Sequence, residues 1–196
     1  IGVEDMTLDC SQMTCTTAGR GNGIHFYGVR YSHIERVNIT GCLNYGIVLD
    51  GDATNFSYSV DVENCRIING GGGILATSSE EAFLTRNEIL QANANLASAQ
   101  PMFSSPDNVG YLVRLKSGYF GIIGNVIGSS GTHTTAAIQV ENSGPTRIIG
   151  NRFDQCRYEA IRTTAGNNLI EGNQIGNPSS VGSTYGIRLG SSNNIV

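Results

Sequence analysis

Asp50 and Asp52 form the first pair of side chains whose types and spacing suit chemistry. They flank one glycine in the sequence Asp50-Gly51-Asp52, and two residues along a strand separate two carboxyl groups by about 6.5 Å. Hydrolysis of a glycosidic bond generally uses two carboxyl groups roughly 5 to 9.5 Å apart. The same tripeptide is also an ordinary turn sequence, and this competing interpretation, a solvated turn, is the one that the sequence favours.

A second group combines two cations with a carboxylate. Arg114 and Lys116 alternate along one expected strand, and Glu141 lies at the corresponding place one repeat later. Lyase or epimerase chemistry on a uronate needs a base and a cation that neutralises the carboxylate, and this group contains both. No sequence motif accompanies it, so the expectation is purely geometric. Glu141 lies three repeats from Asp50, about 14 Å away, which is too far for a hydrolytic pair.

Arginines gather at expected outward positions toward the C-terminal end. Like charges on adjacent strands repel, and an anionic sugar held by guanidinium groups would offset that cost. The competing interpretation, which the sequence slightly favours, is a solvated face with Glu141 as a partial counterion. The side chains expected to bind a glycan on this face are Tyr27, Arg114, Gln139, Arg162 and Arg188.

Histidines and cysteines do not predict a metal or cofactor site. His25, His33 and His133 fall on different repeats and lack the spacing of metal ligands. Cys10 and Cys15 either pair across a small loop, as in an oxidising compartment, or stay free, which the sequence slightly favours. We therefore expect no metal and no cofactor.

A degenerate repeat runs through the whole chain and must position these side chains. Each unit has an apolar residue, a middle residue three positions later, and Ile, Leu or Phe two positions after that. A unit of this length cannot bury its apolar face alone, so consecutive units stack. The middle positions are Met6, Val37, Cys65, Asn87, Asn125, Asn151 and Asn173, 22 to 38 residues apart.

Each repeat also contains a second alternating segment, such as Gly46-Ile47-Val48-Leu49, so it holds at least two short strands. Strands of consecutive units would pair in parallel, and such connections are right-handed by strong preference. The sequence thus predicts an all-β, right-handed parallel β-helix of seven to eight coils. It would form one domain over residues 1–196, with insertion loops at 9–23 and 90–112, and the four middle asparagines would stack as a ladder.

Composition and charge narrow the classes of partner. The formal net charge of −4 argues against bulk nucleic-acid binding. No apolar run approaches the ~20 residues needed for membrane insertion. Both ends fall within a repeat, which predicts an uncapped excerpt of a longer protein.

Two recurring segments resemble those of the pectate-lyase-like β-helix superfamily. They are the Gly-Ile-x-Leu strand starts and the Ile-x-Gly-Asn-x-Ile/Phe segments, such as Ile170-Glu171-Gly172-Asn173-Gln174-Ile175. The resemblance implies a polysaccharide partner and a place outside the cell or on a virion surface. The Asn-Thr-Asp, Asp-Asp and Gly-His-Gly signatures of polygalacturonases are absent.

Two classes of function remain open on this resemblance. The first is recognition of an acidic glycan by part of a phage tailspike or a secreted depolymerase, with a lyase or glycoside hydrolase activity undecided. The second is a structural shaft, adhesin or receptor-binding β-helix without catalysis. A homotrimer is expected if the chain comes from a spike.

Overall fold

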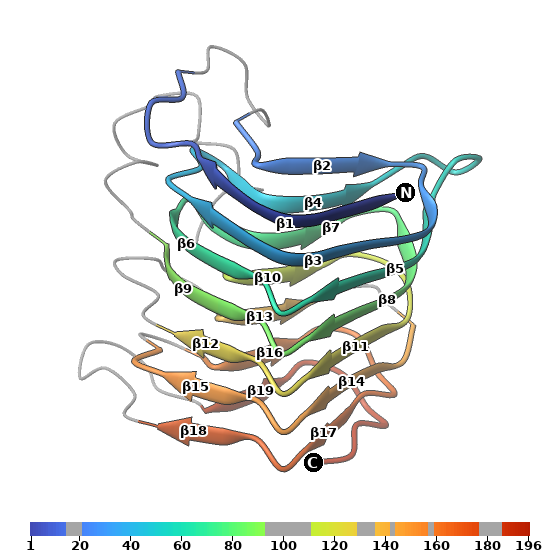
Figure 1. Ribbon diagram of the computed structural model, residues 1–196. Helices are drawn as coiled ribbons and strands as arrows, with labels where there is room; N and C mark the ends of the chain where they lie inside the picture. The colour runs from blue at the N-terminus through green and yellow to red at the C-terminus, as the bar shows by residue number, and fades with distance from the viewer. Residues whose placement is uncertain (15–20, 93–110, 129–135, 142–143, 157–158, 177–185) are drawn as a thin grey trace.

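The alternating segments form nineteen strands and no helix in the described part of the chain. The computed structural model describes residues 1–14, 21–92, 111–128, 136–141, 144–156, 159–176 and 186–196. Of the two expected insertion loops, residues 15–20 and 93–110 lie outside these ranges. The strands wind into a parallel solenoid that runs from the N-terminal to the C-terminal coils (Figure 1).

Seven strands form one flat side of the solenoid. They pair in parallel and in chain order, so each coil adds one strand beside the last. The strands are β2 (Ile24–Tyr27), β4 (Tyr45–Asp50), β7 (Gly72–Ala76), β10 (Val113–Leu115), β13 (Ile138–Val140), β16 (Ile161–Thr163) and β19 (Ile187–Leu189).

A twelve-stranded sheet forms the other two sides. Its centre is the long strand β3 (Arg30–Thr40), which pairs with β1 (Gly2–Asp9). On the other side, the first half of β3 pairs with β5 (Ser57–Glu63) and the second half with β6 (Arg66–Gly70), and each of these begins a series of strands that we call a limb. The first limb is β5, β8 (Ser79–Thr85), β11 (Phe120–Ile123), β14 (Thr146–Ile149) and β17 (Leu169–Glu171). The second limb is β6, β9 (Glu88–Ala92), β12 (Val126–Gly128), β15 (Arg152–Asp154) and β18 (Gln174–Gly176).

The predicted fold class is confirmed, and the predicted number of coils is not. Five coils contain three separate strands, from β4–β5–β6 to β16–β17–β18, instead of seven to eight. The difference arises at the two ends of the solenoid. In the first coils β1 and β3 are single long strands, where each later coil has two strands divided by a bend. In the last coil β19 is the only strand among the described residues.

A two-residue corner separates the limbs in each coil, and in three of the coils it is a Gly-Asn pair. Its first residue has a left-handed backbone, with φ of 65° at Gly124, 64° at Gly150 and 62° at Gly172, a conformation that costs glycine little. The second residue is Asn125, Asn151 or Asn173, which explains the recurring Gly-Asn pair.

Asparagines at these corners form the predicted ladder. The backbone N–H and the Nδ2 of Asn125 both donate to Oδ1 of Asn151, each at 2.9 Å. Asn151 donates in the same way to Asn173, at 2.9 and 3.0 Å. Each described amide therefore satisfies the backbone of the coil beside it, and Asn87, Asn125 and Asn151 are fully buried.

The core consists of apolar columns that follow the repeat. Ile34, Val62, Leu84, Ile122 and Ile148 occupy paired positions on neighbouring strands and are all buried. Cys10, Cys42, Cys65 and Cys156 are free and buried, while Cys15 lies outside the described residues. Burial raises the pKa of the Cys156 thiol to about 12, so this cysteine is a packing residue.

Candidate functional site

The predicted outward column of the seven-stranded sheet has the predicted register. His25 lies beside Val48, which is followed on successive strands by Leu75, Arg114, Gln139, Arg162 and Arg188. The side chains in the middle of the column are buried, whereas those at both ends reach solvent. The accessible part of this face is therefore divided into an N-terminal and a C-terminal region.

Carboxylates of the N-terminal region are held by neighbouring polar groups. The Tyr27 hydroxyl donates to Asp52 at 2.9 Å. Asp50 lies 3.5 Å from the His25 ring nitrogen and accepts a hydrogen bond from Thr77. The two carboxylates thus occupy different hydrogen-bonded groups.

Asp52 organises the turn that follows β4. It accepts the backbone N–H groups of Asn55 and Thr54 at 2.7 and 2.8 Å. These bonds, with that of Tyr27, lower the pKa of Asp52 to about 2. At neutral pH Asp52 is an ionised acceptor and is suited to hold sugar hydroxyl groups. It carries no proton to donate, and its low pKa makes it a weak general base.

Arg114 and Glu141 form an ion pair in the middle of the face. The Arg114 side chain is only 9% exposed, and its Nη2 lies 3.0 Å from Glu141 Oε1. The guanidinium carbon also lies 4.8 Å from the centre of the Tyr111 ring. Burial opposes the charge of Arg114, but Glu141, Tyr45 and Tyr111 together outweigh it, and the pKa of the guanidinium is raised. The cation and carboxylate expected to act on a uronate therefore bind each other.

Lys116 and Gln139 complete the middle region. Lys116 follows β10 and is half-buried, while Gln139 lies beside Arg114 in the sheet and is buried. The Oε1 of Gln139 has no hydrogen-bond partner among the described residues.

Two arginines dominate the C-terminal region. Arg162 on β16 and Arg188 on β19 are directly paired in the sheet. Arg188 is exposed and lies 3.3 Å from the buried Glu159. Arg162 has no carboxylate partner among the described residues, so the region carries excess positive charge.

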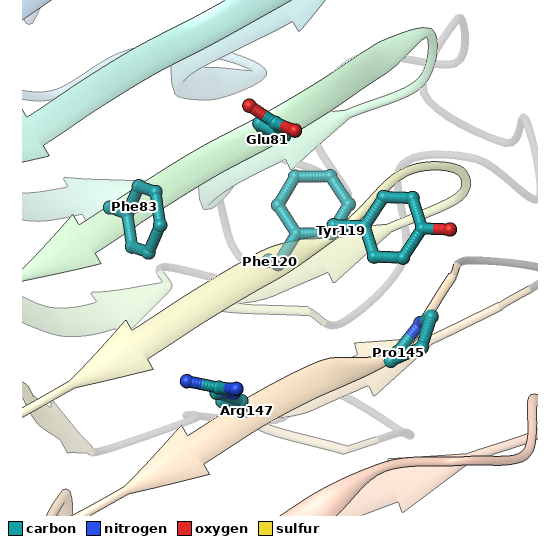
Figure 2. A pocket seen from close by; sticks show the side chains of 6 residues that line it. All are labelled: Glu81, Phe83, Tyr119, Phe120, Pro145 and Arg147. Atoms are coloured by element: carbon teal, nitrogen blue, oxygen red, sulfur yellow. The ribbon is translucent and has the colours of Figure 1, made fainter.

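A groove on the first limb was missed by sequence reasoning. It has a volume of about 540 Å³ and is lined by Glu81, Phe83, Tyr119, Phe120, Pro145 and Arg147 (Figure 2). The available signal was a large aromatic residue at an outward strand position, Phe83 between the inward Ala82 and Leu84. Glycan-binding residues were expected on the seven-stranded sheet, so this signal was not used.

The repeat, the corners and the three sides agree with a family comparison. Residues 22–196 match the family described as the right-handed β-helix region. The chain belongs to this right-handed β-helix family. No curated protein and no solved structure matches it. Membership supports a polysaccharide-related or a structural role, while the fold alone does not decide between them.

Two further searches concern only the described residues of the β-helix. No group of three or more His, Cys, Asp or Glu side chains there could hold a metal ion. No helix in those ranges is long and apolar enough to cross a membrane. His133 lies outside the described residues, whereas His25 faces Asp50.

Proposed function

We propose that this β-helix recognises an acidic polysaccharide along the outer face of its seven-stranded sheet. It would belong to a phage tailspike or a secreted depolymerase and act outside the cell or on a virion surface. The support comes from the accessible side chains of that face, which offer guanidinium groups at one end and hydrogen-bonding groups at the other.

The paired arginines of the C-terminal region carry the proposal. Arg162 and Arg188 are neighbours in the sheet, so their outward side chains start about 4.8 Å apart. Glu159 neutralises part of this charge through Arg188. A carboxylate or sulfate on a sugar would neutralise the rest through charge-assisted hydrogen bonds.

The N-terminal region would hold sugar hydroxyl groups. Asp52 and Tyr27 present an acceptor and a hydroxyl at the surface, six strand spacings from Arg188. Six spacings correspond to about 29 Å, enough for several sugars. Because Asp50 and Asp52 are negative, the anionic sugar units would bind at the arginine end.

The arrangement supports binding more directly than cleavage. Glu141 accepts the hydrogen bonds of Arg114, so neither group is poised beside a ligand. Asp52 is ionised and fixed in its turn. We therefore place recognition first, and depolymerisation is the outcome that an activity assay would add.

Removal of the paired arginines tests the proposal. The R162A/R188A double variant is expected to bind polygalacturonate or alginate at least tenfold more weakly, because charged hydrogen bonds contribute about 1.5–3 kcal/mol each. Affinity electrophoresis in gels that contain each polysaccharide, with a neutral glucan as reference, measures the change. R152A is the matched control. Arg152 is also exposed, but it lies on β15 in the second limb and not on the seven-stranded sheet. Unchanged binding in the double variant would refute the proposed site.

The same polysaccharides report on catalysis. Unsaturated products absorb in the ultraviolet and would direct attention to Lys116 and Glu141. New reducing ends without that absorbance would direct it to Asp50 and Asp52. Binding without either product leaves recognition as the function.

One observation favours a second candidate, a structural shaft or adhesin. Tyr45, Val48 and Leu75 form a buried apolar cluster separate from the main core, and Val48 and Leu75 lie in the outward column. These side chains are already covered within one chain, so this part of the face offers a sugar no polar groups, which suits a structural role such as a shaft in a homotrimer. Light scattering that gives a trimer, together with no binding to any polysaccharide, would favour this candidate.

A further inference from the structure

The groove on the first limb exists because one strand position lacks a side chain. Phe83, Gly121 and Arg147 are aligned on β8, β11 and β14 and all point outward. A Cβ atom added to Gly121 would lie 2.5 Å from Phe83 Cδ1. The Phe83 ring therefore lies over Gly121, where a side chain would exclude it, and forms one wall of the groove. The positions of Phe83 and Arg147 are two strand spacings, or about 10 Å, apart.

A second row of side chains forms the other wall. Ala82, Phe120 and Thr146 are aligned in the sheet, so the residues before them, Glu81, Tyr119 and Pro145, also lie on neighbouring strands. Figure 2 shows Phe83 and Tyr119 on opposite sides of Phe120, with Glu81 and Arg147 on the two other sides. Phe120 is buried in the core and, like the neighbouring Ala82, points inward, so the sheet itself forms the floor.

Both outer rings of the groove expose their faces to solvent. Phe83 is 46% exposed and Tyr119 is 55% exposed. The Tyr119 ring packs closely on Gly144, where a Cβ atom would lie 3.0 Å from ring atom Cε1. This contact backs the ring, so a ligand would meet a preformed surface and little ordering cost would follow.

The chemistry of the lining suits a sugar. A pyranose ring has an apolar C–H face, which packs on an aromatic face, and hydroxyl groups at its edge, which need both acceptors and donors. The Glu81 carboxylate is an acceptor and the Arg147 guanidinium is a donor. One negative and one positive group give no net charge, which favours a neutral sugar. The volume also falls within the ~300–1,000 Å³ of typical ligand sites.

We propose that this groove binds a neutral hexopyranose unit of a polysaccharide. The sugar packs against Phe83 and Tyr119, and its hydroxyl groups bond to Glu81 and Arg147. The proposal shares with the proposed function only the polysaccharide class of ligand, and it uses a different side of the solenoid.

An aromatic track leads from the groove toward the N-terminal coils. The Tyr58 hydroxyl bonds to Glu81, and the Tyr58 ring lies 5.6 Å from that of Tyr31 and 6.4 Å from that of Phe56. The strands β3, β5, β8, β11 and β14 that carry these groups are consecutive in the sheet. They cover four spacings, about 19 Å, so a polysaccharide would lie along the solenoid axis.

Titration with neutral and acidic oligosaccharides tests the groove. The chain has no Trp and eight Tyr, so tyrosine fluorescence and saturation-transfer NMR can follow the binding of gluco-, galacto- and mannooligosaccharides. We expect at least one neutral series to bind and Y119A and F83A each to weaken it about tenfold or more. In G121V the added Cβ would lie 2.5 Å from Phe83 Cδ1, so the Phe83 ring must move away. This variant is expected to abolish binding with an unchanged circular dichroism spectrum, because valine suits a strand.

Controls separate this site from the arginine face. V126A truncates an apolar side chain of the same coil that is 37% exposed and lies outside the groove, and it should bind normally. R162A/R188A should keep neutral-sugar binding. Binding of uronates alone, or neutral-sugar binding that survives G121V and Y119A, would overturn the groove proposal and leave the proposed function standing. Acidic binding that survives R162A/R188A, together with neutral binding that is lost in G121V and Y119A, would overturn the proposed function and leave the groove proposal standing.

Discussion

Asp52 illustrates how single side chains of this β-helix acquire their properties. Three donors converge on its carboxylate, two from its own turn and one from Tyr27 on the neighbouring strand. The backbone donors have the largest effect on its pKa, and Tyr27 adds to it. The bonding is reciprocal, because the hydrogen bond to Asp52 raises the pKa of the Tyr27 hydroxyl.

Removal of the Tyr27 hydroxyl should shift this titration. In Y27F the pKa of Asp52 is expected to rise above about 2 but to stay below its ordinary value of about 3.9, because the two backbone donors remain. Because the pKa of Asp52 is lowered in the folded state, the turn is stabilised at any pH above the ordinary pKa of the carboxyl group. This stabilisation is lost as the pH falls through the folded-state pKa. Carbon-detected NMR of the carboxyl group against pH measures the shift.

The reciprocal variant provides the check on that assignment. In D52N the pKa of Tyr27 should fall toward its ordinary value, because no carboxylate remains at this position to accept the hydrogen bond of the Tyr27 hydroxyl. Identical Asp52 titrations in the wild type and Y27F would show that the Tyr27 hydroxyl does not bond to Asp52 in solution.

At the scale of elements, the asparagine corners hold neighbouring coils together. Each described amide both accepts from the preceding coil and donates to a carbonyl oxygen, as Asn151 does to Ile122 at 2.8 Å. Backbone groups at a corner cannot join the strand pairing on either side, so they depend on these side chains. Without them, the two limbs would meet at a buried bend with unsatisfied backbone groups.

Replacement of one ladder residue should therefore be costly. N151A leaves the backbone N–H and Nδ2 of Asn125 without their acceptor and the Ile122 carbonyl without its donor. At roughly 1–3 kcal/mol for each unsatisfied buried group, we expect the free energy of unfolding to fall by about 3–5 kcal/mol. Urea denaturation followed by circular dichroism measures it. The exposed N38A control should change it by less than about 0.5 kcal/mol, and an equal effect of both variants would contradict the ladder's role.

At the scale of the whole molecule, the solenoid is a stack of interchangeable coils. Asn151 and Asn173 are 22 residues apart and occupy the same position in successive coils. Each coil contacts its neighbours through parallel strands, so its stability depends mainly on the two coils beside it. A coil removed in phase should leave the remaining strands in register.

Deletion of residues 151–172 removes one coil in phase. It joins Gly150 to Asn173, which recreates the native Gly172-Asn173 corner and places β18 beside β12. We expect a folded protein with an unchanged β-sheet circular dichroism signal per residue and a cooperative unfolding transition. Deletion of residues 152–172 is the matched control, since the extra residue turns Ile175 outward and should produce aggregation. Equal behaviour of the two proteins would contradict the nearest-neighbour view.

The sequence by itself determined the register of this β-helix. Alternation along a strand has a period of two, so the repeat identified the inward columns through Ile122 and Ile148 and the outward ones through Arg162 and Arg188. The ladder followed in the same way, because an asparagine at one place in each repeat must meet the next asparagine. These are local rules that need no knowledge of neighbouring faces.

Only the tertiary structure decided which outward side chains reach solvent. Arg114 and Arg188 are equivalent in the repeat, yet the first is buried against Glu141 and Tyr111 and the second is exposed. The groove likewise depends on Phe83 and Gly121, which are 38 residues apart in the sequence and are paired because β8 and β11 lie side by side in the sheet. Accessibility and concavity arise from what lies beside a residue in space, and a repeat pattern does not contain that information.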